Sequence, residues 1–180
     1  LGDELTAVVR SIIDGTNYQN PEKNLMRIGV DAMPAIPRDT TDRNRTSPLA
    51  FTGNKFEFRM LGSSQSVSGP NVALNTIMAE ELGHFADILE KADDFDAALQ
   101  QLVCKTFTEH QRIIFNGNGY SKQWEEEAAN RGLSNLNSTP KSLSAYLDPK
   151  HIALVTKHGI YTEEEYRARH EIHLEAYCKI

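Results

Sequence analysis

A short run of alternating charged and apolar residues, Lys55-Phe56-Glu57-Phe58-Arg59-Met60, holds residue types suited to chemistry. Side chains alternate faces along a β-strand, so a strand here places Lys55, Glu57 and Arg59 on one face and the apolar side chains on the other. The simplest interpretation is a half-exposed strand, with its charges in water and its apolar face in the core. The strand could also present a carboxylate between two cations.

Three arginines, Arg38, Arg43 and Arg45, lie shortly before this strand. Guanidinium groups suit two-point contact with phosphate and carboxylate oxygens. A carboxylate beside several guanidiniums suits a magnesium–phosphate site, in which the acid holds the metal and the arginines hold the anionic oxygens. Asp39 and Asp42 could instead neutralise the arginines within a surface loop, and the residue types alone leave both interpretations open.

Two adjacent motifs resemble a known family. Asn44-Arg45-Thr46-Ser47-Pro48, followed by Lys55-Phe56-Glu57-Phe58-Arg59, resembles the Asn-Arg-Ser and x-x-Glu-x-Arg pair near the end of the glutamine synthetase active site. Residues 38–64, with their Thr-Ser-Pro-x-Ala-Phe-Thr-Gly-Asn text, are similar more specifically to the type III class. The resemblance extends over the whole chain, so we expect a fragment, the C-terminal portion of the catalytic region.

The resemblance implies the chemistry of a glutamate–ammonia ligase. In that family, ATP phosphorylates the side-chain carboxylate of glutamate, and ammonia then displaces phosphate from the glutamyl phosphate intermediate to give glutamine. The parent enzyme would thus assimilate ammonia, with glutamate, ammonia and ATP as substrates and Mg²⁺ or Mn²⁺ as metal. It would form a ring-shaped homo-oligomer with active sites between adjacent subunits.

The same resemblance implies roles for individual residues. Glu57 would be a ligand of the divalent metal nearest the transferred phosphoryl group. Arg59 would bind the glutamate substrate or the developing phosphate, and Arg45 would contact both glutamate and the ATP phosphates. Lys55 would have a weaker role in substrate or ATP binding, because other classes often carry Arg there. Metal and fixed cations suit this reaction because they offset the charge of the transferred group.

The sequence also departs from the wider family. The second arginine of an Ile-Arg-Ile-Pro text has no counterpart, because Pro48-Leu49-Ala50-Phe51 occupies its place, which removes one expected ATP contact. The other metal carboxylates, the metal histidine, the nucleotide pocket and the flap glutamate are not recognisable in these residues and would lie upstream of Leu1. We therefore expect this piece alone to be inactive.

Hydrophobic spacing predicts an α+β fold, mostly helical with a short antiparallel strand element, as part of a glutamine synthetase catalytic domain. Two long helices are predicted, one over residues 70–92 that buries Ile77, Met78 and Leu82, and one from Asp94 to about Gly117 whose buried face includes Ile113. Shorter helices are predicted over residues 3–14, 122–130, 142–147, 151–157 and 162–178, and a short helix or strand at 25–30.

The element pattern also predicts an organisation for the chain. Residues 1–92 would form the last part of the catalytic domain, with the active-site loop and strand at 38–64. Residues 93–180 would form a helical C-terminal region packed on the same unit. The final helix opens with the capping-box pattern Thr162-x-x-Glu165 and is acidic in its first turn.

Two other functions compete with the synthetase interpretation. Glu81-x-x-His84 has the spacing found in di-metal helical bundles, but such bundles need a second motif and two further glutamates. A solvated helix face is the simpler explanation of that pair. Alternatively, the helices after residue 92 could serve as an interaction or assembly module, although their aromatic residues are more typical of a core.

Bulk composition narrows the remaining possibilities. The 180 residues carry a formal net charge of −6, with a pI near 5.5, which argues against binding to nucleic acid or an anionic membrane surface. Cys104 and Cys178 lie in helical segments and fit a reducing compartment, so we expect a cytoplasmic protein. No apolar run approaches the roughly 20 residues that a membrane span needs.

Overall fold

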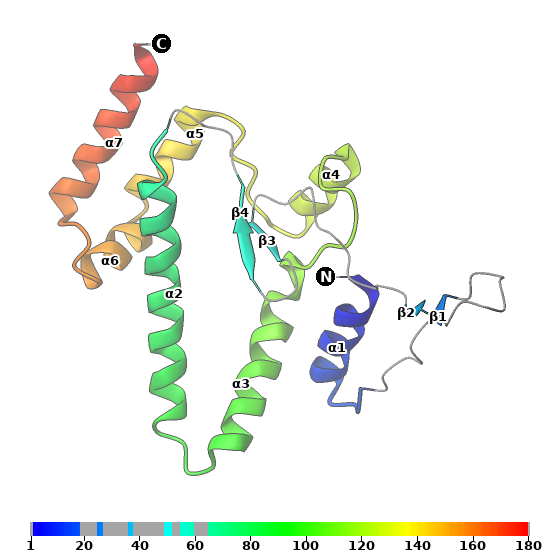
Figure 1. Cartoon of the computed structure of the whole chain (residues 1–180). Helices are drawn as coiled ribbons and strands as arrows, with labels where there is room; N and C mark the ends of the chain where they lie inside the picture. The colour runs from blue at the N-terminus through cyan, green and yellow to red at the C-terminus, as the bar shows by residue number, and fades with distance from the viewer. Residues whose placement is uncertain are drawn as a thin grey trace. The chain divides into compact units, whose positions relative to one another are not determined.

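The computed structural model describes residues 2–18, 25–26, 36–37, 49–51, 55–59 and 65–179. Helices predominate in these residues, and the strands form antiparallel pairs, β1 with β2 and β3 with β4, so the predicted α+β class is confirmed (Figure 1). The elements are α1 (Gly2–Asp14), β1 (Leu25–Met26), β2 (Ile36–Pro37), β3 (Leu49–Phe51), β4 (Phe56–Phe58), α2 (Ser68–Leu89), α3 (Phe95–His110), α4 (Lys122–Asn130), α5 (Thr139–Leu143), α6 (Pro149–Lys157) and α7 (Glu163–Cys178), with 3₁₀ turns η1 (Gln111–Ile113) and η2 (Ser144–Leu147).

The chain forms two compact units that interleave along the sequence. One contains residues 1–62 and 94–131, and the other contains residues 63–93 and 132–180. The predicted division between residues 92 and 93 stays a prediction. No helix in the described part of the chain is both long and apolar enough to cross a membrane.

Helix α1 packs on α3 in the first unit. The Cys104 thiol of α3 lies 3.8 Å from the carbonyl oxygen of Ile13, and Leu102 of α3 is buried. Helix α1 ends at Gly15, whose φ of +64° is a left-handed conformation that glycine adopts without a Cβ clash. The predicted short helix at residues 3–14 is confirmed, and its end is set by that glycine.

Helix α3 starts where the sequence predicts and ends earlier. Asp94 is its N-cap, and its carboxylate accepts a hydrogen bond from the Ala97 N–H at 3.0 Å. The α-helix stops at His110 and gives way to η1, and Ile113 is 61% exposed. The prediction of one helix to about Gly117 with Ile113 on its buried face is therefore wrong, because the 3₁₀ turn changes which side chains share a face.

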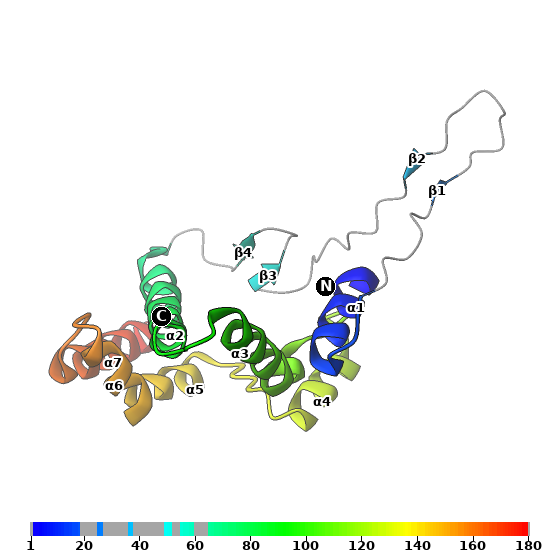
Figure 2. The same ribbon diagram turned by 90° about the horizontal axis from the view of Figure 1, so that it is seen from below.

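The second unit has a small apolar core formed by Leu143 of α5 together with Ile152 and Val155 of α6. Helix α7 packs against α5, α6 and η2, and α6 lies beside α7 in Figures 1 and 2. The predicted capping box of α7 is confirmed, since the Thr162 hydroxyl accepts from the Glu165 N–H at 3.2 Å and the Glu165 carboxylate accepts from the Thr162 N–H at 2.9 Å.

Helix α2 corrects the predicted apolar face. Ile77, Met78 and Leu82 are 49%, 56% and 57% exposed, whereas Thr76 is the buried residue of this helix. The Thr76 hydroxyl donates to the Val72 carbonyl oxygen at 2.7 Å, which satisfies it inside the packed surface. Periodicity predicted a long helix correctly, but in its unit α2 contacts α6 over a limited surface and not along the whole apolar stripe.

Candidate functional site

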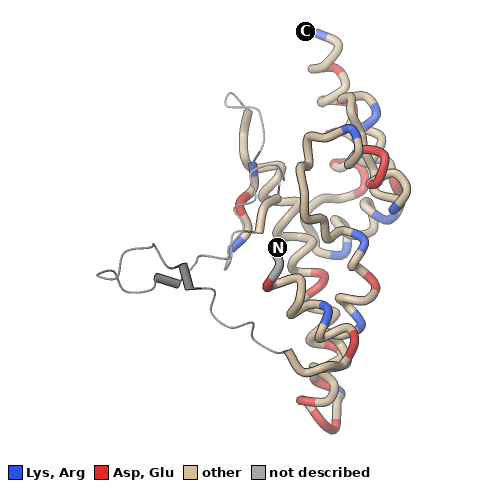
Figure 3. The backbone as a smooth tube through the Cα atoms, turned by 90° about the vertical axis from the view of Figure 1, so that its right-hand side faces the viewer, with Lys and Arg blue, Asp and Glu red and all other residues tan. Residues whose placement is uncertain are grey.

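The candidate site centres on the hairpin of β3 and β4. The two strands pair antiparallel, with Leu49 opposite Phe58, Ala50 opposite Glu57 and Phe51 opposite Phe56. Ala50 is fully buried. The pairing confirms the predicted strand and fixes the alternation of its side chains, so that Lys55, Glu57 and Arg59 share a face. Figure 3 shows the basic, acidic, basic order along this strand.

A single carboxylate joins the three charged side chains. Glu57 Oε1 lies 3.1 Å from Lys55 Nζ, and Glu57 Oε2 accepts hydrogen bonds from Arg59 at 2.6 Å and 3.2 Å. The hydrogen bond from Arg59, followed by that from Lys55, lowers the pKa of Glu57 below its usual value. The carboxylate therefore stays ionised and keeps its orientation.

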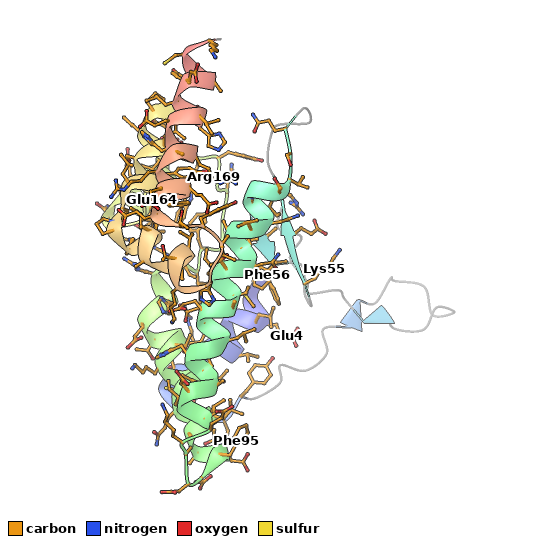
Figure 4. The ribbon with its side chains drawn as sticks, turned by 90° about the vertical axis from the view of Figure 1, so that its left-hand side faces the viewer. Glu4, Lys55, Phe56, Phe95, Glu164 and Arg169 are labelled. Atoms are coloured by element: carbon orange, nitrogen blue, oxygen red, sulfur yellow. The ribbon has the colours of Figure 1, made fainter. Side chains whose placement is uncertain are left out.

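The uncharged face of β4 does not form the expected core. Phe56 is 66% exposed and Phe58 is 43% exposed, and the ring of Phe56 lies 5.2 Å from that of Phe51 on the paired strand. Lys55 and Phe56 extend to opposite sides of the strand in Figure 4. The prediction that this face is buried is wrong, because within the described residues the hairpin's element contacts are between β3 and β4 alone.

Several residues of the predicted site lie outside the described part of the chain. Arg45, Arg38 and Arg43 are among them, as is Met60, so the structure gives no position for the arginine segment. Within the described ranges, no group of three or more His, Cys, Asp or Glu side chains is placed to hold a metal ion. The described residues thus bring together Lys55, Glu57 and Arg59, and offer one carboxylate for a metal.

The structure also forms a charged cluster that sequence spacing did not predict. Glu80 of α2 accepts from Lys157 Nζ at 2.7 Å, and its carboxylate lies 2.8 Å from Nε2 of His158 at the end of α6. These contacts lower the pKa of Glu80, the Lys157 hydrogen bond being the largest cause and the His158 bond the next. The partners are 77 and 78 residues apart, so only the fold reveals them.

The neighbouring Glu81-x-x-His84 pair shows no ligand set. Both side chains are exposed on α2, and no metal-binding group includes them among the described residues. The cluster of Glu80, Lys157 and His158 has one acid and two bases, which makes it an ion-pair cluster between helices. These contacts join α2 to α6 within the second unit.

Comparison with known proteins shows what this chain is similar to. Residues 98–180 match the family model described as the glutamine synthetase C-terminal domain. The similarity then extends over nearly the whole chain to one class in particular. The chain is 46% identical, over 99% of its length, to a type-3 glutamine synthetase of Dictyostelium discoideum, which confirms the resemblance to the type III class.

Bacterial relatives show the same coverage. The chain is 37% identical to a glutamine synthetase of Bacteroides fragilis over 98% of its length, and 38% identical to one of Butyrivibrio fibrisolvens over 99%. In each case the match covers only a quarter of the relative, at 25%, 25% and 26% of its length for the three proteins. The chain is thus similar to one part of a much longer enzyme.

Proposed function

We propose that this chain supplies one edge of the active site of a type III glutamine synthetase, which ligates ammonia to glutamate through a glutamyl phosphate intermediate at the expense of ATP. The observation that carries the proposal is the charged face of β4, where Lys55, Glu57 and Arg59 form one connected group. The similarity to three proteins named glutamine synthetase supports the reaction class.

The proposed roles of Arg59, Lys55 and Arg45 follow from the chemistry of their side chains. Arg59 presents a planar guanidinium suited to the carboxylate of glutamate or to phosphate oxygens. Lys55 adds a second cation on the same face and takes a lesser part in holding the anion. Arg45 would contact glutamate and the ATP phosphates, as the family motif implies. Together these cations would offset the charge that gathers on the transferred phosphoryl group.

Glu57 fits one ligand position of a divalent metal. Carboxylate oxygens are the ligands that Mg²⁺ and Mn²⁺ prefer, and the Glu57 side chain is 37% exposed on an accessible strand. Glu57 would hold the metal through a carboxylate oxygen, and the bound metal would supply polarisation of the phosphate oxygens. Since the described residues provide no complete ligand set, the remaining ligands would come from other parts of the enzyme. On the same ground we propose that the 180-residue chain alone produces no glutamine.

The assembly of the enzyme is part of the same proposal. A homo-oligomeric ring with sites between subunits would leave the helices after residue 92 to pack within or between subunits. A purely structural module, with no part in the active site, is the second candidate, and the large exposed apolar side chains of α2 favour it. The two candidates differ in whether substitution on β4 changes turnover.

Substitution of Glu57 in the full-length enzyme separates the candidates. Glu57→Gln keeps the size of the side chain but removes its charge, so we expect kcat for glutamine formation to fall by about 100-fold. We expect Arg59→Gln to raise KM for glutamate by about tenfold, because the substitution removes one charge-assisted hydrogen bond to the substrate. Steady-state assays with Mg²⁺ measure both.

Glu126→Gln is the matched control. Glu126 is an exposed glutamate of α4, so its substitution should leave kcat unchanged. Unchanged kcat in Glu57→Gln as well would contradict the active-site proposal and favour the structural module. Turnover by the isolated 180-residue chain would separately overturn the proposal that the other parts of the enzyme are required.

A further inference from the structure

A second charged location lies in the first unit, apart from β4. A hollow of about 500 Å³ lies between α1 and the segment that follows α3. Its lining includes Arg10 of α1, Arg112 of η1, Phe115, Asn116 and Arg131. Pockets for small molecules have volumes of roughly 300–1,000 Å³, so this hollow is large enough for a small ligand.

Among the described residues, two of the three arginines have no protein partner for their guanidinium groups. Within the described part of the chain, neither Arg10 nor Arg112 makes a side-chain hydrogen bond or ion pair, although Asp14 lies one helical turn after Arg10. Both guanidiniums are permanently charged donors. Both line the same hollow, so an anion placed there could accept hydrogen bonds from both groups.

Arg131, the third arginine, contacts other residues of the protein. Arg131 Nε donates to Glu127 at 2.6 Å, and its NH1 group donates to the carbonyl oxygen of Ile114 at 2.9 Å. Its guanidinium also lies over the ring of Trp124, 5.5 Å from the centroid. Arg131 therefore fixes the segment that carries Arg112, and it leaves the other two arginines to meet a ligand.

The remaining walls are held by contacts between distant parts of the chain. Asn116 donates to the Thr6 hydroxyl at 2.7 Å, which joins the far wall to α1. Phe115, which lines the hollow, stacks on Trp124 with ring centroids 3.8 Å apart. The hollow is thus bounded by a cross-linked frame, and Trp124 lies against two of its lining residues.

We propose that this hollow binds a small dianionic oxyanion, of the phosphate or dicarboxylate type, with Arg10 and Arg112 as its ligands. Guanidiniums from two separate elements can each offer two parallel N–H donors to such an anion, which gives both charge balance and directed hydrogen bonds. Binding would also fasten α1 to the segment after α3, because each element contributes one of the two ligands.

Tryptophan fluorescence can test the proposal, because Trp124 is the single tryptophan of this sequence. The 180-residue chain is titrated with inorganic phosphate in one arm and with succinate in the other. Each anion is added up to about 10 mM, a range that detects weak binding. We expect saturable quenching or enhancement in at least one arm, and the stronger arm tells phosphate from carboxylate.

Variants assign the binding to this hollow. We expect Arg10→Gln and Arg112→Gln each to weaken binding by about tenfold, with Arg10→Lys retaining part of it because charge remains. Arg167→Gln on α7 should leave the affinity unchanged, and circular dichroism checks that each variant is folded. Absence of saturable binding in both arms, or equal affinity in folded Arg10→Gln and Arg112→Gln variants, would overturn the proposal. Neither result bears on the synthetase proposal, which rests on other residues.

Discussion

Two neighbouring cations, Lys55 and Arg59, set the pKa of the Glu57 carboxylate. Arg59 and Lys55 hold it from two sides and lower its pKa, the hydrogen bond from Arg59 being the largest cause. An acid whose pKa is lowered in the folded state stabilises that state at pH values above its unfolded pKa. This contribution is lost as pH falls through the lowered, folded pKa.

Arg59→Gln should therefore raise the pKa of Glu57 toward its usual value. We expect Lys55→Gln to raise it too, but by less, because the Arg59 contact is the larger cause. Carbon-detected NMR of the glutamate side chain against pH measures both shifts. A larger pKa shift in Lys55→Gln than in Arg59→Gln would contradict this prediction, because it would mean that the Lys55 contact is the larger cause of the lowered pKa.

Among the helices, the capping box of α7 is a local feature that the sequence alone predicted. Its two reciprocal hydrogen bonds satisfy N–H groups that the helix start would otherwise leave open. Thr162→Ala should lower the free energy of unfolding by about 1 kcal/mol, the usual effect of losing such a cap. Urea unfolding followed by circular dichroism measures the change.

Thr156→Ala, at an exposed position of α6 in the same unit, is the control for this prediction. It should change stability by less than about 0.5 kcal/mol, since it removes no cap. Equal effects of the two substitutions would mean that the capping box contributes nothing specific to α7.

Glu80 lies in the contact between α2 and α6. No local sequence pattern predicts its partners there. We expect Glu80→Gln to lower the urea midpoint at pH 7, because it removes the acceptor for Lys157 and His158. The pKa of Glu80 is lowered in the fold, so this difference should shrink as pH falls through that lowered pKa and the native carboxyl becomes protonated. Urea titrations at several pH values follow it.

Glu81→Gln serves as the comparison, because Glu81 is the exposed neighbour of Glu80 on the same helix. Its midpoint should match that of the unsubstituted protein at every pH. A Glu80→Gln midpoint that also matches, or a difference that persists at acid pH, would rule out the ion-pair cluster as a contributor to this contact.

Local signals predicted the elements better than their burial. The caps Asp94 and Thr162 and the span of α4 follow from residues close together in sequence, and the structure confirms them. The exposed faces of α2 and β4 contradict the prediction, since an apolar stripe shows only that a face could be buried. What covers a face depends on contacts between distant segments, as does the presence of Arg10 and Arg112 around one hollow.

For the whole molecule, the chain has the size of a domain but the relatives are about four times as long. The alternation of β4 predicted the shared face of Lys55, Glu57 and Arg59, which the structure confirms. Within the described residues, no group of three or more His, Cys, Asp or Glu side chains could hold a metal ion, so the fold of these residues shows no complete metal site.

Mn²⁺ binding to the full-length enzyme shows whether Glu57 is a metal ligand of a glutamine synthetase, as we propose. Electron paramagnetic resonance counts free Mn²⁺ in titrations of the unsubstituted enzyme, Glu57→Gln and the control Glu126→Gln. We predict that Glu57→Gln weakens one class of Mn²⁺ site by at least about tenfold while Glu126→Gln leaves all sites unchanged. Identical Mn²⁺ binding by all three proteins would mean that Glu57 is not a metal ligand.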